Sequence, residues 1–281
     1  MNPNTCLLTN FILNDRVVSS SDFNPDELNK GKVIYEVMRV ITGSPLFFHE
    51  HVERFNYSLI NSGCKTTLSK KSITSRIKSL IETNRLKDGN IRFQVNFTSD
   101  YKATFSAWAC PYYYPQKELY KIGASLSTIK AQRDNPNIKT YNPDLIRNAF
   151  SHINKNNIYE VLLLNKDGLI TEGSRSNIFF VEGNILTTPP LSSVLPGITR
   201  IKVIEIAKKL GITCNETDIN YNSLQLFEGA FITGTSPKVL PIGKIDDITF
   251  NPNHPTISYI MDNYNDILDS YIAGFSWSQF V

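Results

Sequence analysis

The segment LITEGSRSNIFFVEGNILTTPPLSSVLPGITR, residues 169–200, constrains the fold more than any other part of the chain. Its short apolar runs, separated by small-residue turns, predict paired strands followed by a Pro-rich loop. Gly197-Ile198-Thr199 then opens an amphipathic helix. Free N–H groups and partial positive charge at a helix N-terminus suit an anion such as phosphate. The segment thus combines one acid in a small-residue turn, Glu172, with a candidate anion site, although a hairpin residue and an ordinary helix cap are the alternative interpretations.

The N-terminal part of the chain mixes helical and strand periodicity. GKVIYEVMRV and the residues after its Gly-Ser-Pro turn predict strands over 32–41 and 45–48, with a helix from about residue 49. A second helix is predicted over 70–84. GNIRFQVNFTSD and KATFSAWACPYYY read as two strands joined by a polar turn. This order favours an α+β unit.

A connector rich in Pro and Tyr, residues 111–119, separates this unit from a second one. We therefore expect two domains, a small N-terminal one over 1–115 and a larger one over 116–281. In the second, strand patterns alternate with helical patterns at YNPDLIRNAFSHINKNN and TRIKVIEIAKKLG. The segment GAFITGTSPKVLPIGKI predicts a strand, a small-residue turn and another strand. A last helix is expected over 255–274.

Composition excludes several classes of function. The net charge is +3 with acids and bases interspersed, so nucleic acid is not an expected partner. No apolar run approaches the ~18 residues of a membrane span, and the N-terminus does not resemble a secretion signal. We expect a cytoplasmic protein without membrane contact. The four cysteines are scattered, and His49 and His51 form the only close histidine pair, so no metal site is expected.

Two further segments add candidate phosphate ligands. TGTSP, residues 233–237, is a small-residue turn after a strand, and Arg54 lies in HEHVERF. Three phosphate elements without a Walker or GxGxxG loop favour a small phosphorylated cofactor over a nucleotide. Pyridoxal 5′-phosphate fits best, because it needs a phosphate cup, a lysine and an acid or arginine facing its ring nitrogen. Glu172 can be that acid. A tight loop and a solvated helix arginine are the simpler alternatives.

These motifs together resemble the class IV aminotransferases, the fold-type-IV enzymes that use pyridoxal phosphate. The resemblance covers roughly residues 30–245 and depends most on TEGSRSNIFFV, TPP and LPGITR in that order, supported by GKVIYEVMRV, HEHVERF and FITGTSPKVLPI. It implies an α/β (α+β) protein with a small α+β N-terminal domain and a larger mixed α/β domain. It also implies a homodimer that acts on amino acids and 2-oxo acids.

The resemblance assigns roles to individual residues. Lys139, in NIKTYN, falls at the position of the Schiff-base lysine, with Lys130 and then Lys121 as weaker candidates. Glu172 would face the pyridine nitrogen of the cofactor. The remaining residues expected to hold or support the cofactor are Arg54, Asn177, Leu195, Gly197, Ile198, Thr199, Gly234 and Thr235, with Ile198 acting through its backbone N–H.

The residues expected to contact the substrate lie on two strands and one turn. Strand alternation puts Tyr35 on the same face as Val37 and Arg39. Arg92, in NIRFQVNF, resembles an arginine of branched-chain enzymes and could clamp a substrate carboxylate, or it could be a surface residue. Ser236 lies in the TGTSP turn. Tyr112–Tyr114 could line the pocket mouth, although a connector packed by its own aromatics is the preferred alternative.

Departures from the family pattern narrow the activity. The segment NFTSDYKATF lacks the arginine and histidine of the carboxylate trap in D-amino acid enzymes. Glu228 stands alone where relatives carry an Asp-Glu pair, and Pro237 removes one N–H from the phosphate turn. The intact Gly-Thr turn favours transamination, with a branched-chain amino acid or glutamate as donor. The alternatives are a lyase of the aminodeoxychorismate type, which releases pyruvate by β-elimination, and a cofactor-binding protein without turnover.

Overall fold

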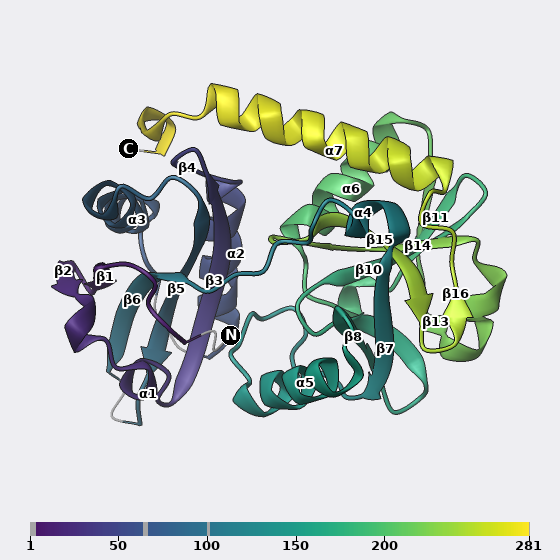
Figure 1. Ribbon diagram of the computed structural model, residues 1–281. Helices are drawn as coiled ribbons and strands as arrows, with labels where there is room; N and C mark the ends of the chain where they lie inside the picture. The colour runs from purple at the N-terminus through teal and green to yellow at the C-terminus, as the bar shows by residue number, and fades with distance from the viewer. Residues whose placement is uncertain (1–3, 64–66, 100–101, 281) are drawn as a thin grey trace. The chain divides into compact units, whose positions relative to one another are not determined.

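The structure is a computed structural model that describes residues 4–63, 67–99 and 102–280 (Figure 1). The chain divides into two compact units. Unit 1 comprises Met1–Tyr113, Ile138–Tyr141 and Leu268–Val281, and unit 2 comprises Tyr114–Asn137 and Asn142–Ile267. The expected domains, 1–115 and 116–281, place these last two segments of unit 1 in the larger domain. The division into two functional domains stays a prediction.

Unit 1 is built on a six-stranded antiparallel sheet in the order β2-β1-β6-β5-β3-β4. Its strands are β1 (Asn10–Leu13), β2 (Arg16–Ser19), β3 (Lys32–Ile41), β4 (Ser44–Pro45), β5 (Gly89–Phe97) and β6 (Ala103–Cys110), and its helices are α1 (Pro25–Leu28), α2 (Phe48–Asn61) and α3 (Lys70–Asn84). Side chains of α2 and α3 pack with Ile34, Met38 and Phe93 in one apolar core. The opposite face of β3 carries Tyr35, as the strand alternation predicts.

The predicted strand over 32–41 and the helix over 70–84 are confirmed. The strand predicted over 45–48 is wrong, because β4 ends at Pro45 and α2 begins at Phe48. Phe47 between them takes a left-handed backbone conformation, with φ of 50°, which turns the chain into the helix. The N-terminal hairpin of β1 and β2 is an element that our sequence reading missed.

The short segment 138–141 runs along β3. The Tyr35 N–H donates to the carbonyl of Lys139 at 3.1 Å, and the Tyr141 N–H donates to the carbonyl of Val33 at 2.9 Å. The Lys139 N–H in turn donates to Ser58 Oγ on α2 at 3.2 Å. Two hydrogen bonds of the Lys139 main chain and one of the Tyr141 main chain therefore fix the backbone of this segment.

Unit 2 contains a ten-stranded mixed sheet in the order β12-β11-β10-β14-β15-β7-β8-β9-β13, with β16 paired to β15. The pairs β7–β8, β7–β15 and β11–β12 are parallel and the others antiparallel. The strands are β7 (Ala124–Lys130), β8 (Glu160–Leu164), β9 (Leu169–Gly173), β10 (Asn177–Glu182), β11 (Ile185–Thr188), β12 (Thr213–Glu216), β13 (Ile219–Asn220), β14 (Gly229–Gly234), β15 (Lys238–Ile245) and β16 (Ile248–Thr249).

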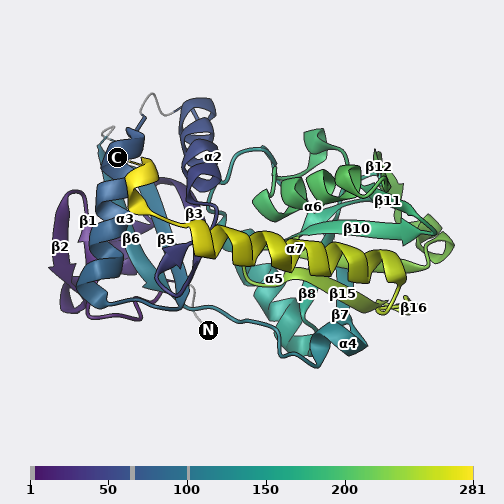
Figure 2. The same ribbon diagram turned by 90° about the horizontal axis from the view of Figure 1, so that it is seen from above.

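Helices accompany this sheet. They are α4 (Leu119–Ile122), α5 (Pro143–Asn156), α6 (Ile198–Lys209) and the part of α7 (Pro255–Gly274) before Leu268, where unit 1 resumes. Helix α7 confirms the helix predicted over 255–274. Figure 2 shows α5 beside β8 and α6 beside β10. Within the described residues no helix combines the length and apolar character that crossing a bilayer requires. The motif segment, residues 169–200, forms β9, β10, β11 and the N-terminus of α6.

Candidate active site

Lys139 in unit 1 lies beside the aromatic face of β3. Its Nζ is 5.1 Å from the centroid of the Tyr35 ring, a distance at which a cation and a ring attract. The competing lysines have other surroundings: Lys121 forms an exposed ion pair with Glu118, and Lys130 is exposed at the end of β7. Of the three lysines, Lys139 is the one that is partly buried.

Arg54 is not the solvated helix arginine that was the simpler expectation. Its guanidinium donates from Nε and Nη2 to the two oxygens of Glu36, at 2.8 and 2.7 Å, and its side chain is only 9% exposed. The fully buried Glu36 also bonds Nδ1 of His51 at 2.8 Å. Burial opposes the ionised form of Glu36, but Arg54 and His51 outweigh it and lower the pKa of this carboxyl to about 2. A bidentate carboxylate thus fixes the plane of Arg54.

Arg92 on β5 is almost completely buried, with 3% of its surface exposed. This excludes the interpretation of Arg92 as a surface arginine. Its guanidinium carbon lies 4.7 Å from the centroid of Tyr35, 4.6 Å from that of Tyr141 and 5.2 Å from that of Trp108. Burial lowers the pKa of Arg92, and the surrounding tyrosines oppose that shift. The structure therefore places a desolvated cation on the same face of the sheet as Tyr35.

Glu172 lies buried on β9 in unit 2 and is held from two sides. The N–H of Leu195 donates to its Oε2 at 3.1 Å, and Nε of Arg133 lies 2.8 Å from its Oε1. Arg133 also donates from Nη2 to the carbonyl of Ser174 at 2.9 Å, which ties it to the turn after β9. Sequence reasoning missed Arg133, since a lone arginine before a Pro-rich stretch carries no signal of its partner.

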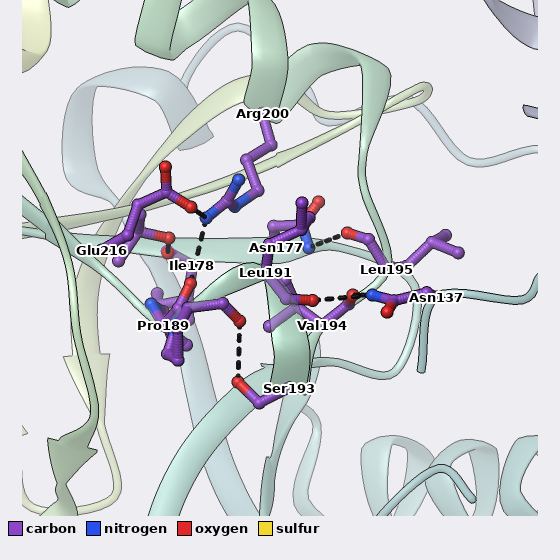
Figure 3. Close-up of polar contacts among 12 residues, drawn as sticks. Asn137, Asn177, Ile178, Pro189, Leu191, Ser193, Val194, Leu195, Arg200 and Glu216 are labelled. Carbon is purple, nitrogen blue, oxygen red and sulfur yellow. Dashed lines mark hydrogen bonds and ion pairs between the residues drawn. The ribbon is translucent and has the colours of Figure 1, made fainter. Parts of the chain in front are cut away.

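Side chains from three elements hold the loop over 189–197 by its carbonyl groups (Figure 3). Asn137 donates to the carbonyls of Leu191 and Val194, at 2.6 and 2.7 Å. Asn177, which was expected to support this region, donates to the carbonyl of Leu195 at 2.9 Å. The buried Arg200 donates to Pro189 and forms an ion pair with Glu216. The loop that carries Leu195 is therefore rigidly positioned against β10.

The N-terminus of α6 has the features of an anion site. Its N-cap is Gly197, which offers no side-chain hydrogen bond to the first turn, and a Cβ added there would overlap Oδ1 of Asn177. Ile198 and Thr199 are buried in the first turn. Thr199 Oγ1 is 3.3 Å from the hydroxyl of Tyr264. Backbone N–H groups can therefore approach an anion closely here.

The turn of Gly234, Thr235 and Ser236 joins β14 to β15. Pro237, which ends the turn, accepts a hydrogen bond from Tyr120 at 2.9 Å through its carbonyl. Among the described residues, the buried hydroxyls of Thr233, next to this turn, and of Ser176 have no hydrogen-bond partner. Such groups are costly unless a ligand or water satisfies them, so they fit a phosphate-bearing cofactor.

The metal-ligand, cysteine and connector-tyrosine candidates have less structural support as parts of the site. Within the described part of the chain, no three His, Cys, Asp or Glu side chains gather in a way that could hold a metal ion. Cys6, Cys110 and Cys214 are free thiols, and burial raises the pKa of Cys110 to about 12. The fourth cysteine, Cys64, lies outside the described residues. Tyr113 is exposed in the connector, and whether Tyr112–Tyr114 line a pocket stays a prediction.

Comparison with known proteins places these features in a family. The amino-transferase class IV family model matches residues 33–245. D-Alanine aminotransferase of Bacillus licheniformis is 26% identical over 89% of this chain and 91% of its own length. Aminodeoxychorismate lyase of Bacillus subtilis is 26% identical over 77% of this chain and 78% of its own. The branched-chain amino acid aminotransferase of Escherichia coli, 22% identical, shares the fold with a TM-score of 0.82 over 92% of this chain and 94% of that structure.

The chain therefore belongs to the class IV aminotransferase family, whose members use pyridoxal phosphate. The expected cofactor, the enzyme class and the two-domain fold type are confirmed. This family membership supports an enzyme rather than a cofactor-binding protein without turnover.

Proposed function

We propose that this enzyme moves an amino group between an amino acid and a 2-oxo acid, with Lys139 as the Schiff-base lysine and Glu172 as the acid for the ring nitrogen. The observation that carries the proposal is the environment of Glu172. Its buried carboxylate lies between the N–H of Leu195 and the side chain of Arg133. The hydrogen bond from Leu195 and the ion pair with Arg133 hold this buried carboxylate in one orientation, as a partner for a protonated ring nitrogen requires.

The family resemblance assigns the phosphate of the cofactor to four residues. Ile198, through its backbone N–H, and Thr199, Thr235 and Arg54 would hold it. Gly197 and Gly234 keep backbone free of side chains at these turns. Leu195 would pack on a ring face, with Asn177 holding the Leu195 carbonyl. When bound, pyridoxal phosphate supplies an electron sink for the electrons left as the substrate loses its α-proton.

Lys139 would carry the proton in this reaction. Its main chain is fixed by hydrogen bonds to Tyr35 on β3 and to Ser58 on α2, so the side chain starts from one place. Glu36 fixes Arg54 through two hydrogen bonds, so a phosphate held by Arg54 would be held in one orientation. The chain's own contribution is thus orientation and proton transfer at Nζ.

Tyr35, Arg92 and Ser236 are the proposed substrate residues. Tyr35 and Arg92 stack on one face of β3 and β5, and Arg92 has the charge to bind a substrate carboxylate. The lack of the D-specific arginine and histidine favours an L-amino acid, and we test branched-chain amino acids and glutamate first. The relatives include both a D-alanine aminotransferase and branched-chain enzymes, so both hands belong in the test.

An absorbance titration of the cofactor-loaded protein tests the proposal. A panel of L- and D-amino acids should include one that converts the pyridoxal absorption band into the pyridoxamine band, which shows transfer and identifies the donor and its hand. If the pyridoxal band is present and no amino acid converts it, transamination of amino acids is refuted.

The second candidate is β-elimination with release of pyruvate, which the similarity to an aminodeoxychorismate lyase favours. It needs no acceptor, so aminodeoxychorismate alone would yield pyruvate. The Gly-Thr turn over 234–235 supports transamination instead. Pyruvate release from that single substrate, with no conversion by amino acids, would replace the first proposal by the second.

We also propose a homodimeric, cytoplasmic enzyme with domains over 1–115 and 116–281. Family resemblance supports the dimer, and the unpaired thiols among the described cysteines agree with a reducing compartment. Sedimentation equilibrium tests the dimer, cell fractionation tests the location, and limited proteolysis in the 111–119 connector tests the domain boundary.

A further inference from the structure

Arg92 is a buried cation whose hydrogen-bond partners are all neutral. Its Nε donates to Oε1 of Gln94 at 2.8 Å, its Nη1 to Oδ1 of Asn4 at 3.1 Å and its Nη2 to Oδ1 of Asn29 at 2.9 Å. Among the residues that the structure describes, no carboxylate forms an ion pair with it. Three side-chain amides thus stand where a buried arginine normally has an acid.

Such an arrangement favours an incoming anion. A buried charge is costly unless it is paired, and neutral amide oxygens and three aromatic rings compensate only part of the lost hydration. A carboxylate forms stronger, charge-assisted hydrogen bonds with a guanidinium than an amide does, and it can bind two N–H groups at once. To do so at Arg92, it must replace at least one of the amide oxygens.

The three amides come from different segments, and each donates a further hydrogen bond. Gln94 belongs to β5 itself and donates to the carbonyl of Leu28 at 2.6 Å. Asn29 follows α1 and donates to the carbonyl of Pro25 at 2.8 Å. Asn4 lies on the segment that precedes β1, and its amide nitrogen donates to the hydroxyl of Tyr141 at 2.9 Å. Asn4 is therefore the amide partner of Arg92 that also contacts the segment after Lys139.

We infer that Asn4 determines substrate affinity, because its amide oxygen holds the Nη1 position of Arg92 that a substrate carboxylate takes over. The inference rests on the proposed role of Arg92 in substrate binding. Tyr141, the other partner of Asn4, follows Lys139 by two residues, so the Asn4 amide links Arg92 to the segment that carries the proposed catalytic lysine. The charge and size of residue 4 then set how easily a carboxylate reaches Arg92.

Two substitutions at this position should act in opposite directions. Asn4→Asp keeps the size of the side chain and supplies an internal carboxylate, so an external one must compete with an ion pair. Asn4→Ala leaves Nη1 without its amide partner, so an external carboxylate no longer displaces anything. Asn10→Asp makes the same chemical change in β1, where the side chain contacts Thr9, and serves as the matched control.

The experiment is calorimetric titration of the cofactor-loaded protein with glutarate, a dicarboxylate without an amino or oxo group. We expect the Kd to rise about tenfold or more for Asn4→Asp, the size of one hydrogen bond to a charged group. It should fall severalfold for Asn4→Ala and stay unchanged for Asn10→Asp. The Tm of Asn4→Asp should rise, which reports that the internal ion pair has formed.

The variant Arg92→Gln tests the proposed role of Arg92 separately from the inference about Asn4. If glutarate binds wild type and Arg92→Gln equally, or binds neither, the proposed substrate role of Arg92 is wrong. If Arg92→Gln weakens binding while both Asn4 variants bind like wild type, Arg92 keeps its role and the inference about Asn4 is overturned. An effect of Asn4→Asp that persists in the Arg92→Gln background would also overturn it, because the effect would not act through Arg92.

Discussion

At the scale of single residues, the group of Glu36, His51 and Arg54 is the most consequential for both stability and function. Glu36 is fully buried, and its pKa of about 2 lies below its usual 4.5 because Arg54 and His51 outweigh the effect of burial. A depressed folded-state pKa means stability that is present above pH 4.5 and lost as the pH falls towards 2. The shift corresponds to roughly 3 kcal/mol of unfolding free energy.

We predict that Glu36→Gln lowers the unfolding free energy at pH 7 by about 3 kcal/mol, because it removes the carboxylate that two side chains share. The difference from wild type should shrink as the pH is lowered from 5 to 3, because Glu36 takes up a proton in the unfolded chain below about pH 4.5 while the folded group stays ionised. Urea unfolding at three pH values measures it. Glu228→Gln, at an exposed acid beside His254, is the control and should change little. A pH-independent difference would contradict the electrostatic account.

How far single residues were predictable depended on whether their partners were local. Arg54 and Glu172 were found from motifs, but their partners were not, because Glu36 and Arg133 reach them only through the fold. Arg92 left two interpretations open, since a strand position does not reveal burial. Asn4, whose amide oxygen accepts a hydrogen bond from Arg92, is 88 positions away from it in the sequence. Asn4 had no sequence signal at all.

At the scale of elements, the N-terminus of α6 requires a glycine at position 197. The reason is that a side chain there would not fit, and not that the backbone conformation is one that only glycine adopts. Gly197 has an ordinary φ of −66°, yet an added Cβ would overlap the side chain of Asn177. Asn177 in turn holds the Leu195 carbonyl. A change at Gly197 therefore moves both the helix start and the loop that carries Leu195.

We predict that Gly197→Ala destabilises the protein by about 1–3 kcal/mol, the usual cost of overpacking. It should also weaken binding of pyridoxal phosphate about tenfold or more through the displaced first turn. Thermal unfolding and fluorescence titration measure the two effects. Gly274→Ala, where an added Cβ meets nothing within 4 Å, should change neither. Unaltered cofactor affinity in Gly197→Ala would exclude this helix start from the phosphate site.

The elements of the motif segment were predictable because each has its own periodicity and turn residues. The segment 169–200 contains β9, β10, β11 and the start of α6 in the expected order. The β1–β2 hairpin was missed, although Asn14-Asp15 between two apolar runs is a turn signal, and Asn14 does take a positive φ of 55°. The predicted strand over 45–48 failed because its apolar residues, including Phe48, are buried by a helix start instead.

At the scale of the whole molecule, a cofactor that binds only the folded chain must stabilise it. Ligand at a hundred times its Kd adds about 2.7 kcal/mol. We predict that pyridoxal phosphate raises Tm by several degrees and that pyridoxal, which lacks the phosphate, raises it much less at equal concentration. Differential scanning calorimetry of the cofactor-free protein measures both. Equal shifts would show that the phosphate contributes nothing and would contradict the assignments at α6 and Thr235.

The central claim is that Lys139 forms the covalent link to the cofactor, and reductive trapping tests it most directly. The protein is loaded with pyridoxal phosphate, reduced with borohydride, digested and analysed by mass spectrometry. We predict one phosphopyridoxyl group, on the peptide that contains Lys139, and none in Lys139→Ala. A label on Lys130, on Lys121 or on another lysine, or an unchanged label in Lys139→Ala, would contradict the account.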